Sequence, residues 1–352
     1  MNKLVIIGNG FDLAHGLKTR YSDFLLWEIN EAFKQKSRHI KSPLFEVESS
    51  VHNICDENYK PFQFDKIDDF LKFQTEYEGY FKISYAFPFI KYLIDYSNKN
   101  WVDIEREYYE QLLLVNELRS GGNYGWRKSL TDLNCALDLI KLELEKYLKS
   151  VEYNGYLHDV MNCLNNEIKI DKLDDSNKVL FLNFNYTSTI KNYLNSIEPE
   201  YCSVNYIHGK LEDKSNPIIF GYGDEIDDRY AEIEKLNKND FLKHMKSFAY
   251  LQTSNYKHLF EFLDKKNEKF DVFIMGHSCG LSDRLLFTHI FEHPNFNSVK
   301  IYYYDKPDGT NDFFERTQEL SRYFRLDSKH KMRKVLLPFS ESKPLIQYKP
   351  QI

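Results

Sequence analysis

Apolar and polar positions change their spacing along this sequence. In its second half, short continuous apolar runs of the kind that form buried strands are separated by stretches with helical spacing. The expected strands cover residues 3–7, 178–184, 203–207, 217–220, 271–275, 299–304 and 333–337. The expected helices cover residues 187–197, 282–292 and 312–322. This alternation predicts an α/β fold, with a Rossmann-like, mostly parallel sheet and helices on both of its faces.

A long stretch after the first strand has a different pattern. Apolar residues recur at helical spacing from Leu25 to Phe33 and from Leu137 to Leu148, and residues 42–100 mix aromatic with acidic side chains. We interpret residues 25–170 as a large, mainly helical insertion after the first strand–helix unit. Residues 1–24 and 171–352 then form the α/β domain, and the insertion is expected to cap the carboxyl edge of its sheet.

The composition narrows the class of protein. The chain has 352 residues and a net charge of -6, which does not favour a nucleic-acid surface. Its five cysteines include no CxxC pair, so neither a zinc site nor a disulfide scaffold is expected. Strand residues begin at position 3, and no apolar run has the length of a bilayer span. We therefore expect a cytoplasmic protein without a membrane segment or a metal.

The first strand ends in a glycine turn, Gly8-Asn9-Gly10-Phe11-Asp12. Strand, glycine turn and helix is the arrangement with which α/β folds hold a phosphate or a nucleotide at a strand end. The turn lacks the third glycine of the dehydrogenase fingerprint, and many such turns carry glycine for steric reasons alone. From the turn itself, a ligand contact and a purely steric role both stay open.

Polar residues also follow three later strands. They are Asn183 to Thr187, His208-Gly209-Lys210, and Gly276-His277-Ser278-Cys279-Gly280 with Asp283. Taken singly, Asn185 could cap a helix and His208 could be a buried histidine with satisfied hydrogen bonds. Because the carboxyl ends of parallel strands meet at one edge of a sheet, we expect these side chains to converge in one crevice.

The order and spacing of these motifs resemble the bacterial abortive-infection AbiH family. The opening block comprises Gly8 to Asp12, Gly16-Leu17-Lys18-Thr19 and Tyr21-Ser22-Asp23-Phe24. The later blocks are Phe184-Asn185-Tyr186-Thr187, Ile207-His208-Gly209 and Gly276-His277-Ser278 followed by Asp283. The resemblance covers nearly the whole chain and implies an antiphage effector that binds a nucleotide. The implied ligand-binding residues are Gly8, Asn9, Gly10, Phe11, Asp12, Thr19, Tyr21, Gly276, Ser278 and Asp283.

The chain is also distantly similar to the sirtuin-like (SIR2) antiphage NADases and to sirtuins. Asn185 and His208 fall where those proteins have a strand-end asparagine and a catalytic histidine. The similarity implies a SIR2-like sheet and a glycohydrolase that cleaves NAD between nicotinamide and ribose. NAD would be the substrate, and no cofactor would be required. An imidazole that titrates near neutral pH can accept a proton, and an amide can orient a water or the ribose.

The chain departs from the sirtuin-like pattern at several positions. Thr187 stands where those NADases usually have aspartate, Asp12 where sirtuins have a small residue, and Lys18-Thr19-Arg20 where sirtuins have Pro-Asp-Phe. These departures count against NAD as the specific ligand more than they count against nucleotide binding in general. Because no four-cysteine zinc module is present, protein deacetylation is not expected.

We rank an NAD-cleaving effector first among three functions. The alternatives are a nucleotide-binding sensor or switch without turnover, and another nucleotide hydrolase or a nuclease. The acidic charge and the lack of a recognisable pair of metal-binding carboxylates count against a nuclease. The expected partners are NAD or a related nucleotide, a phage trigger or partner protein, and further copies of this chain in a homo-oligomer.

Overall fold

The computed structural model describes the whole chain except residues 51–52, 98–102, 152–155, 195–196, 199, 224, 226, 266–267 and 349–352. It divides into two compact units. The α/β unit comprises Met1–Leu17, Glu152–Asp227 and Met245–Ile352, and the second unit comprises Lys18–Val151 and Asp228–His244. That the insertion caps the sheet edge stays a prediction.

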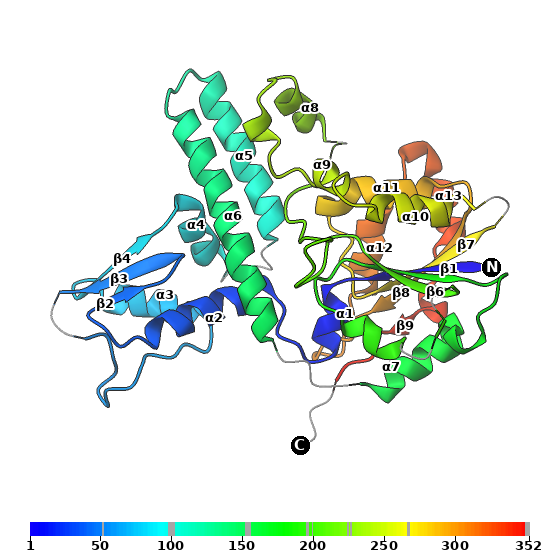
Figure 1. The fold of residues 1–352 in the computed structure, drawn as a ribbon, viewed down its shortest axis with the longest axis horizontal. Coiled ribbons are helices and arrows are strands. Elements are labelled where there is room, and N and C mark those ends of the chain that lie inside the picture. The colour runs from blue at the N-terminus through cyan, green and yellow to red at the C-terminus, as the bar shows by residue number, and fades with distance from the viewer. Residues whose placement is uncertain are drawn as a thin grey trace. The chain divides into compact units, whose positions relative to one another are not determined.

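The α/β unit is built on a six-stranded sheet in the order β6-β5-β1-β7-β8-β9 (Figure 1). Its strands are β1 Asn2–Ile7, β5 Val179–Asn183, β6 Cys202–Tyr206, β7 Phe270–Met275, β8 Phe296–Tyr303 and β9 Lys343–Pro344. Every pair of neighbours is parallel. The predicted Rossmann-like α/β architecture is therefore confirmed.

Two apolar layers cover the faces of this sheet. Leu4 and Ile6 of β1 face one layer and Val5 and Ile7 face the other, as the alternation of side chains along a strand requires. The first layer is completed by α10 Asn255–Leu263, α11 Arg284–Glu292 and α12 Phe313–Ser321, and the second by α1 Asn9–Ala14 and α7 His158–Cys163 (Figure 1). The short α9 Lys246–Tyr250 and α13 Lys329–Val335 also belong to this unit.

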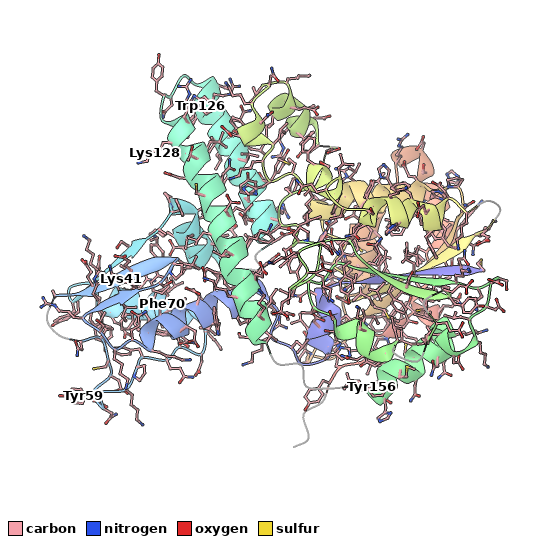
Figure 2. The ribbon with its side chains drawn as sticks, viewed as in Figure 1. Lys41, Tyr59, Phe70, Trp126, Lys128 and Tyr156 are labelled. Atoms are coloured by element: carbon pink, nitrogen blue, oxygen red, sulfur yellow. The ribbon has the colours of Figure 1, made fainter. Side chains whose placement is uncertain are left out.

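The second unit contains long helices and a small antiparallel sheet. Its elements are α2 Tyr21–Phe33, β2 His39–Lys41, β3 Phe45–Ser49, α3 Ile67–Glu76, β4 Phe81–Tyr85, α4 Pro88–Tyr96, α5 Ile104–Ser120, α6 Trp126–Ser150 and α8 Asp228–Glu234. Helices α5 and α6 lie side by side (Figure 1). Phe70 of α3 is fully buried, whereas Tyr59 is 82% exposed (both labelled in Figure 2).

The segment Asp228–His244 returns to the second unit and packs on α6. Trp126, at the start of α6 (Figure 2), stacks on Phe241 with 5.9 Å between ring centroids. The side-chain amide of Asn134 donates to the Asp240 carbonyl at 2.9 Å. The second unit is therefore assembled from two separate stretches of chain.

Several sequence-based predictions of elements were wrong. The antiparallel strands β2 to β4 were not predicted, because each is three to five residues long and follows a pattern shared with exposed loops. Residues 217–220 form no strand in the structure; Pro217 has no N–H to donate to a ladder. Residues 333–337 belong mostly to α13, and the predicted helix 187–197 is a 3-10 helix over Thr189–Tyr193, with 195–196 outside the described residues.

Among the residues that the structure describes, no helix has both the length and the apolar character needed to cross a membrane.

Candidate functional site

The glycine turn after β1 packs directly against the turn after β7. The Gly10 N–H donates to the Gly276 carbonyl at 2.7 Å, and a Cβ on Gly10 would lie 2.7 Å from that oxygen. A Cβ on Gly8 would lie 2.5 Å from the Cα of His277. Gly8 precedes the first turn of α1 and Gly10 belongs to that helix, so Gly10 does not have a positive φ. The glycines are required by backbone packing, and their contact with a nucleotide stays a prediction.

A buried charge cluster lies beyond the carboxyl ends of β6 and β7. Asp283 Oδ1 is 2.9 Å from His208 Nε2 and 2.9 Å from the Lys246 ammonium. His277 Nε2 lies 3.8 Å from the other carboxylate oxygen. All four side chains are buried. We call these residues the Asp283 cluster; within it the carboxylate is held by a full positive charge, as a buried carboxylate requires.

The protonation states in the Asp283 cluster follow from burial and from Lys246. Burial alone would raise the pKa of Asp283, but the Lys246 ammonium and the neighbouring imidazoles hold it well below its ordinary value. Burial, and then the charge of Lys246, lower the pKa of His208. At neutral pH the cluster therefore holds an ionised carboxylate, and His208 is neutral.

His208 is oriented on two sides. Its Nε2 is 3.0 Å from the Tyr250 hydroxyl as well as within hydrogen-bond distance of Asp283. The Phe184 ring packs on His208 at 4.9 Å and on His277 at 4.2 Å between centroids. Because an ionised carboxylate can only accept a hydrogen bond, Nε2 carries the hydrogen of the neutral imidazole, and Nδ1 is the nitrogen whose lone pair could take a proton.

Asn185 is bonded to a different partner. Its side-chain amide donates to the Gly8 carbonyl at 3.0 Å, and its backbone N–H donates to Asn183 Oδ1 at 3.1 Å. Asn185 follows Phe184, whose ring packs on His208, and both residues come after parallel strands at the same edge of the sheet. Their action on one substrate stays a prediction.

Comparison with protein families gives a match over residues 4–305 to the family described as Bacteriophage abortive infection AbiH. This chain belongs to the AbiH family. The match covers most of the chain and includes every motif of the site, so the resemblance to the AbiH family is confirmed, whereas the similarity to sirtuin-like NADases stays a prediction. Family membership implies a role in phage abortive infection. No curated protein matches the chain.

In this AbiH protein, Asp12 and Thr187, two residues that depart from the sirtuin-like pattern, are in direct contact. The Thr187 hydroxyl donates to Asp12 Oδ2 at 2.5 Å. Burial raises the pKa of Asp12 to about 6, and its Oδ1 is buried without a hydrogen-bond partner among the described residues. An aspartate at position 187 would place a second carboxylate against Asp12, which a buried site disfavours. The hydroxyl at 187 and the carboxylate at 12 therefore form a matched pair.

The other predicted ligand-binding residues differ in burial and in the unit to which they belong. Phe11 is buried on His15 and Tyr193, and Ser278 is exposed, with its carbonyl accepting from Arg316 at 2.9 Å. Thr19 and Tyr21 belong to the second unit, and their role in ligand binding stays a prediction.

Sequence reasoning did not select three residues of the AbiH site. Lys246 and Tyr250 come from a charged helical stretch without a motif, and His277 lies in a glycine turn whose pattern predicts no role for it. No group of three His, Cys, Asp or Glu side chains with metal-binding geometry occurs in the described part of the chain, and the ammonium of Lys246 supplies the cation beside Asp283.

Two buried groups of the AbiH site, His277 and Asp12, change the folding stability in opposite directions at acid pH. His277 Nδ1 accepts the Cys279 N–H at 2.9 Å, and burial lowers the pKa of His277 from 6.5 to about 3. Below pH 6.5 the unfolded state therefore binds the extra proton, and folding stability falls as the pH drops toward 3. Asp12 acts oppositely, because its folded pKa of about 6 exceeds the ordinary 3.8. Protonation of Asp12 in the folded state therefore adds folding stability as the pH drops through 6, and this added stability is lost as the pH rises again.

We expect Asp12→Asn to make acid destabilisation steeper. Between pH 7 and pH 5, the variant should lose about 1 kcal/mol more of its unfolding free energy than the wild type, because the opposing contribution of Asp12 is removed. Urea titrations at both pH values measure the difference. Equal losses in the two proteins would show that Asp12 does not bind a proton in the folded state over this range.

Proposed function

We propose that this AbiH protein is an abortive-infection effector whose α/β unit binds NAD at the carboxyl edge of the sheet and hydrolyses the nicotinamide–ribose bond. The observation that supports the proposal most strongly is the neutral His208 held 2.9 Å from the Asp283 carboxylate, beyond the end of β6. That edge is where parallel α/β sheets bind their ligands.

The reaction needs one acceptor for a proton. The bond between ribose C1′ and the nicotinamide nitrogen breaks, and its electron pair leaves on nicotinamide. Water adds to C1′, and its proton passes to Nδ1 of His208, because Nε2 already donates to Asp283, whose carboxylate then stabilises the imidazolium. The products are nicotinamide and ADP-ribose. Asn185 Oδ1 would orient the water or the ribose, while its amide nitrogen holds Gly8 in place.

We expect His208→Ala to lower NAD hydrolysis by about a hundredfold or more, because it removes the proton acceptor. Purified protein is incubated with NAD, and nicotinamide release is followed by chromatography, with and without lysate from phage-infected cells. The same variant should abolish toxicity in cells at unchanged protein level.

His293→Ala is the matched control. His293 Nε2 is also 3.0 Å from a carboxylate, that of Asp264, but it packs on Phe270 at the start of β7. This variant should keep the wild-type rate. An Asn185→Ala, His208→Ala double variant should be hardly slower than either single variant if the two residues act in one transition state. Full activity of His208→Ala would refute the proposed base.

One observation favours a second candidate, a nucleotide-binding switch without turnover. The amide nitrogen of Asn185 and the Nε2 of His208 are both engaged within the protein, by Gly8 and by Asp283 with Tyr250. Calorimetry with NAD separates the two functions: binding by a protein that releases no nicotinamide, even with infected lysate, identifies the switch.

A further inference from the structure

A cavity of about 540 Å³ is lined in part by Leu281 and Arg284, which lie close to Asp283 in the chain. It is lined by parts of α11 and by the segment from Arg322 to Lys329. Its volume falls within the range of about 300–1,000 Å³ that is usual for small-molecule sites. None of its lining residues belongs to the Asp283 cluster, so it is separate from the site described above.

Basic side chains surround this cavity, whose accessible lining is otherwise mainly apolar. Arg284, Arg322, Arg325 and Lys329 line it, together with the carboxylate of Glu292. Arg325 pairs with Glu292 at 3.1 Å, and Arg322 pairs with Glu319. Both pairs are partly exposed, and pairs of this kind contribute little to stability, so a multivalent anion can replace the carboxylates at low cost. A basic concavity on a chain whose net charge is -6 concentrates anions locally.

The cavity is connected by hydrogen bonds to the Asp283 loop. The hydroxyl of Tyr323, a lining residue, donates to the carbonyls of Cys279 and Gly280 at 2.5 and 2.9 Å. Leu281 and Arg284 also line the cavity and flank Asp283 in sequence. A ligand that contacts these residues therefore contacts the segment that positions the buried carboxylate.

We propose that this basic cavity, between α11 and the segment 322–329, is an effector site for a small molecule bearing a polyphosphate. Guanidinium groups bind phosphate oxygens in pairs of hydrogen bonds, and three of the lining residues are arginines. Occupation of the cavity stabilises one conformation of the loop 276–283. The cavity would thus couple the level of a phosphorylated metabolite to the Asp283 cluster, whether that cluster catalyses a reaction or only binds a ligand.

The binding test uses inorganic pyrophosphate and ATP as probes in calorimetry with the full chain. The Arg322→Ala, Arg325→Ala double variant changes two exposed side chains and should bind the probes about tenfold more weakly or worse. Arg333→Ala, an exposed arginine on α13 outside the cavity, is the matched control and should bind as the wild type does. Tighter binding of ATP than of pyrophosphate identifies a nucleotide, and equal binding identifies the polyphosphate alone.

The coupling test uses hydrogen exchange. Pyrophosphate should slow amide exchange in residues 276–283 of the wild type and of His208→Ala, so the result does not depend on NAD hydrolysis. Tyr323→Phe should still bind the probe but should lose most of this protection, because the hydroxyl that joins the cavity to the loop is gone. The proposal is overturned if neither probe binds at millimolar concentration, if the double variant binds like the wild type, or if the loop exchanges equally fast with and without the probe.

Discussion

Gly276→Ala is expected to prevent the α/β unit from folding. Gly276 has a φ of +74°, and a Cβ built on it would lie 2.1 Å from the Phe11 nitrogen and 2.5 Å from the Gly10 carbonyl carbon. These are backbone atoms at the start of α1, and they cannot move without separating α1 from β1. We expect a loss of about 4 kcal/mol or more in unfolding free energy, or an insoluble protein. Soluble yield, circular dichroism and urea denaturation measure the effect.

Gly309→Ala separates backbone strain from the clash. Gly309 has a similar φ of +83°, but a Cβ there meets nothing within 4 Å. Only the cost of a left-handed residue applies, about 1 kcal/mol. Gly10→Val should behave like Gly276→Ala, because the Gly276 carbonyl occupies the space that the valine needs. A folded Gly276→Ala protein as stable as Gly309→Ala would contradict the close packing of the two turns.

Asp283→Ala should cost about 3–5 kcal/mol of folding free energy at pH 7.5. Removing the carboxylate leaves the Lys246 ammonium, whose side chain is 0% exposed, without the charge that balances it. The hydrogen bond to His208 is lost as well. Urea denaturation measures the loss, and the variant should recover part of its stability when Lys246→Met removes the stranded charge.

The comparison for Asp283 is Asp264→Ala. Asp264 also forms an ion pair with a histidine, at 3.0 Å from His293, but its side chain is 67% exposed. An exposed pair contributes about 1 kcal/mol or less, so this variant should be nearly as stable as the wild type. Equal losses in the two aspartate variants would mean that Lys246 and Asp283 are not a buried pair in solution.

The central strands could be predicted from the sequence because a strand buried on both faces consists of apolar residues. Residues of β1, β5 and β7 are buried on both faces, so the strands are continuous apolar runs. The strand ends then placed Asn185, His208 and Asp283 at one edge of the sheet. The edge strand β9 has only two residues, Lys343 and Pro344, and offers no such pattern.

The charge cluster could not be predicted in full from the sequence. Lys246 lies 37 residues before Asp283 and follows a segment of charged and polar residues, where a lysine ordinarily faces solvent. Only the folded chain shows that it is buried beside a carboxylate. From the sequence, the glycine turn could serve either a ligand contact or close backbone packing, because glycine permits both. The structure shows the close packing, against the turn after β7.

Two separate stretches of the gene encode the second unit, because it comprises Lys18–Val151 and Asp228–His244. The contacts of Asn134 with Asp240 and of Trp126 with Phe241 join the two stretches, yet β5 and β6 are encoded between them. No single exchange of gene segments can therefore transfer the second unit complete without carrying β5 and β6, two of the six strands of the parallel sheet, with it. Recombination that exchanges the second unit as one continuous segment therefore has to exchange β5 and β6 with it.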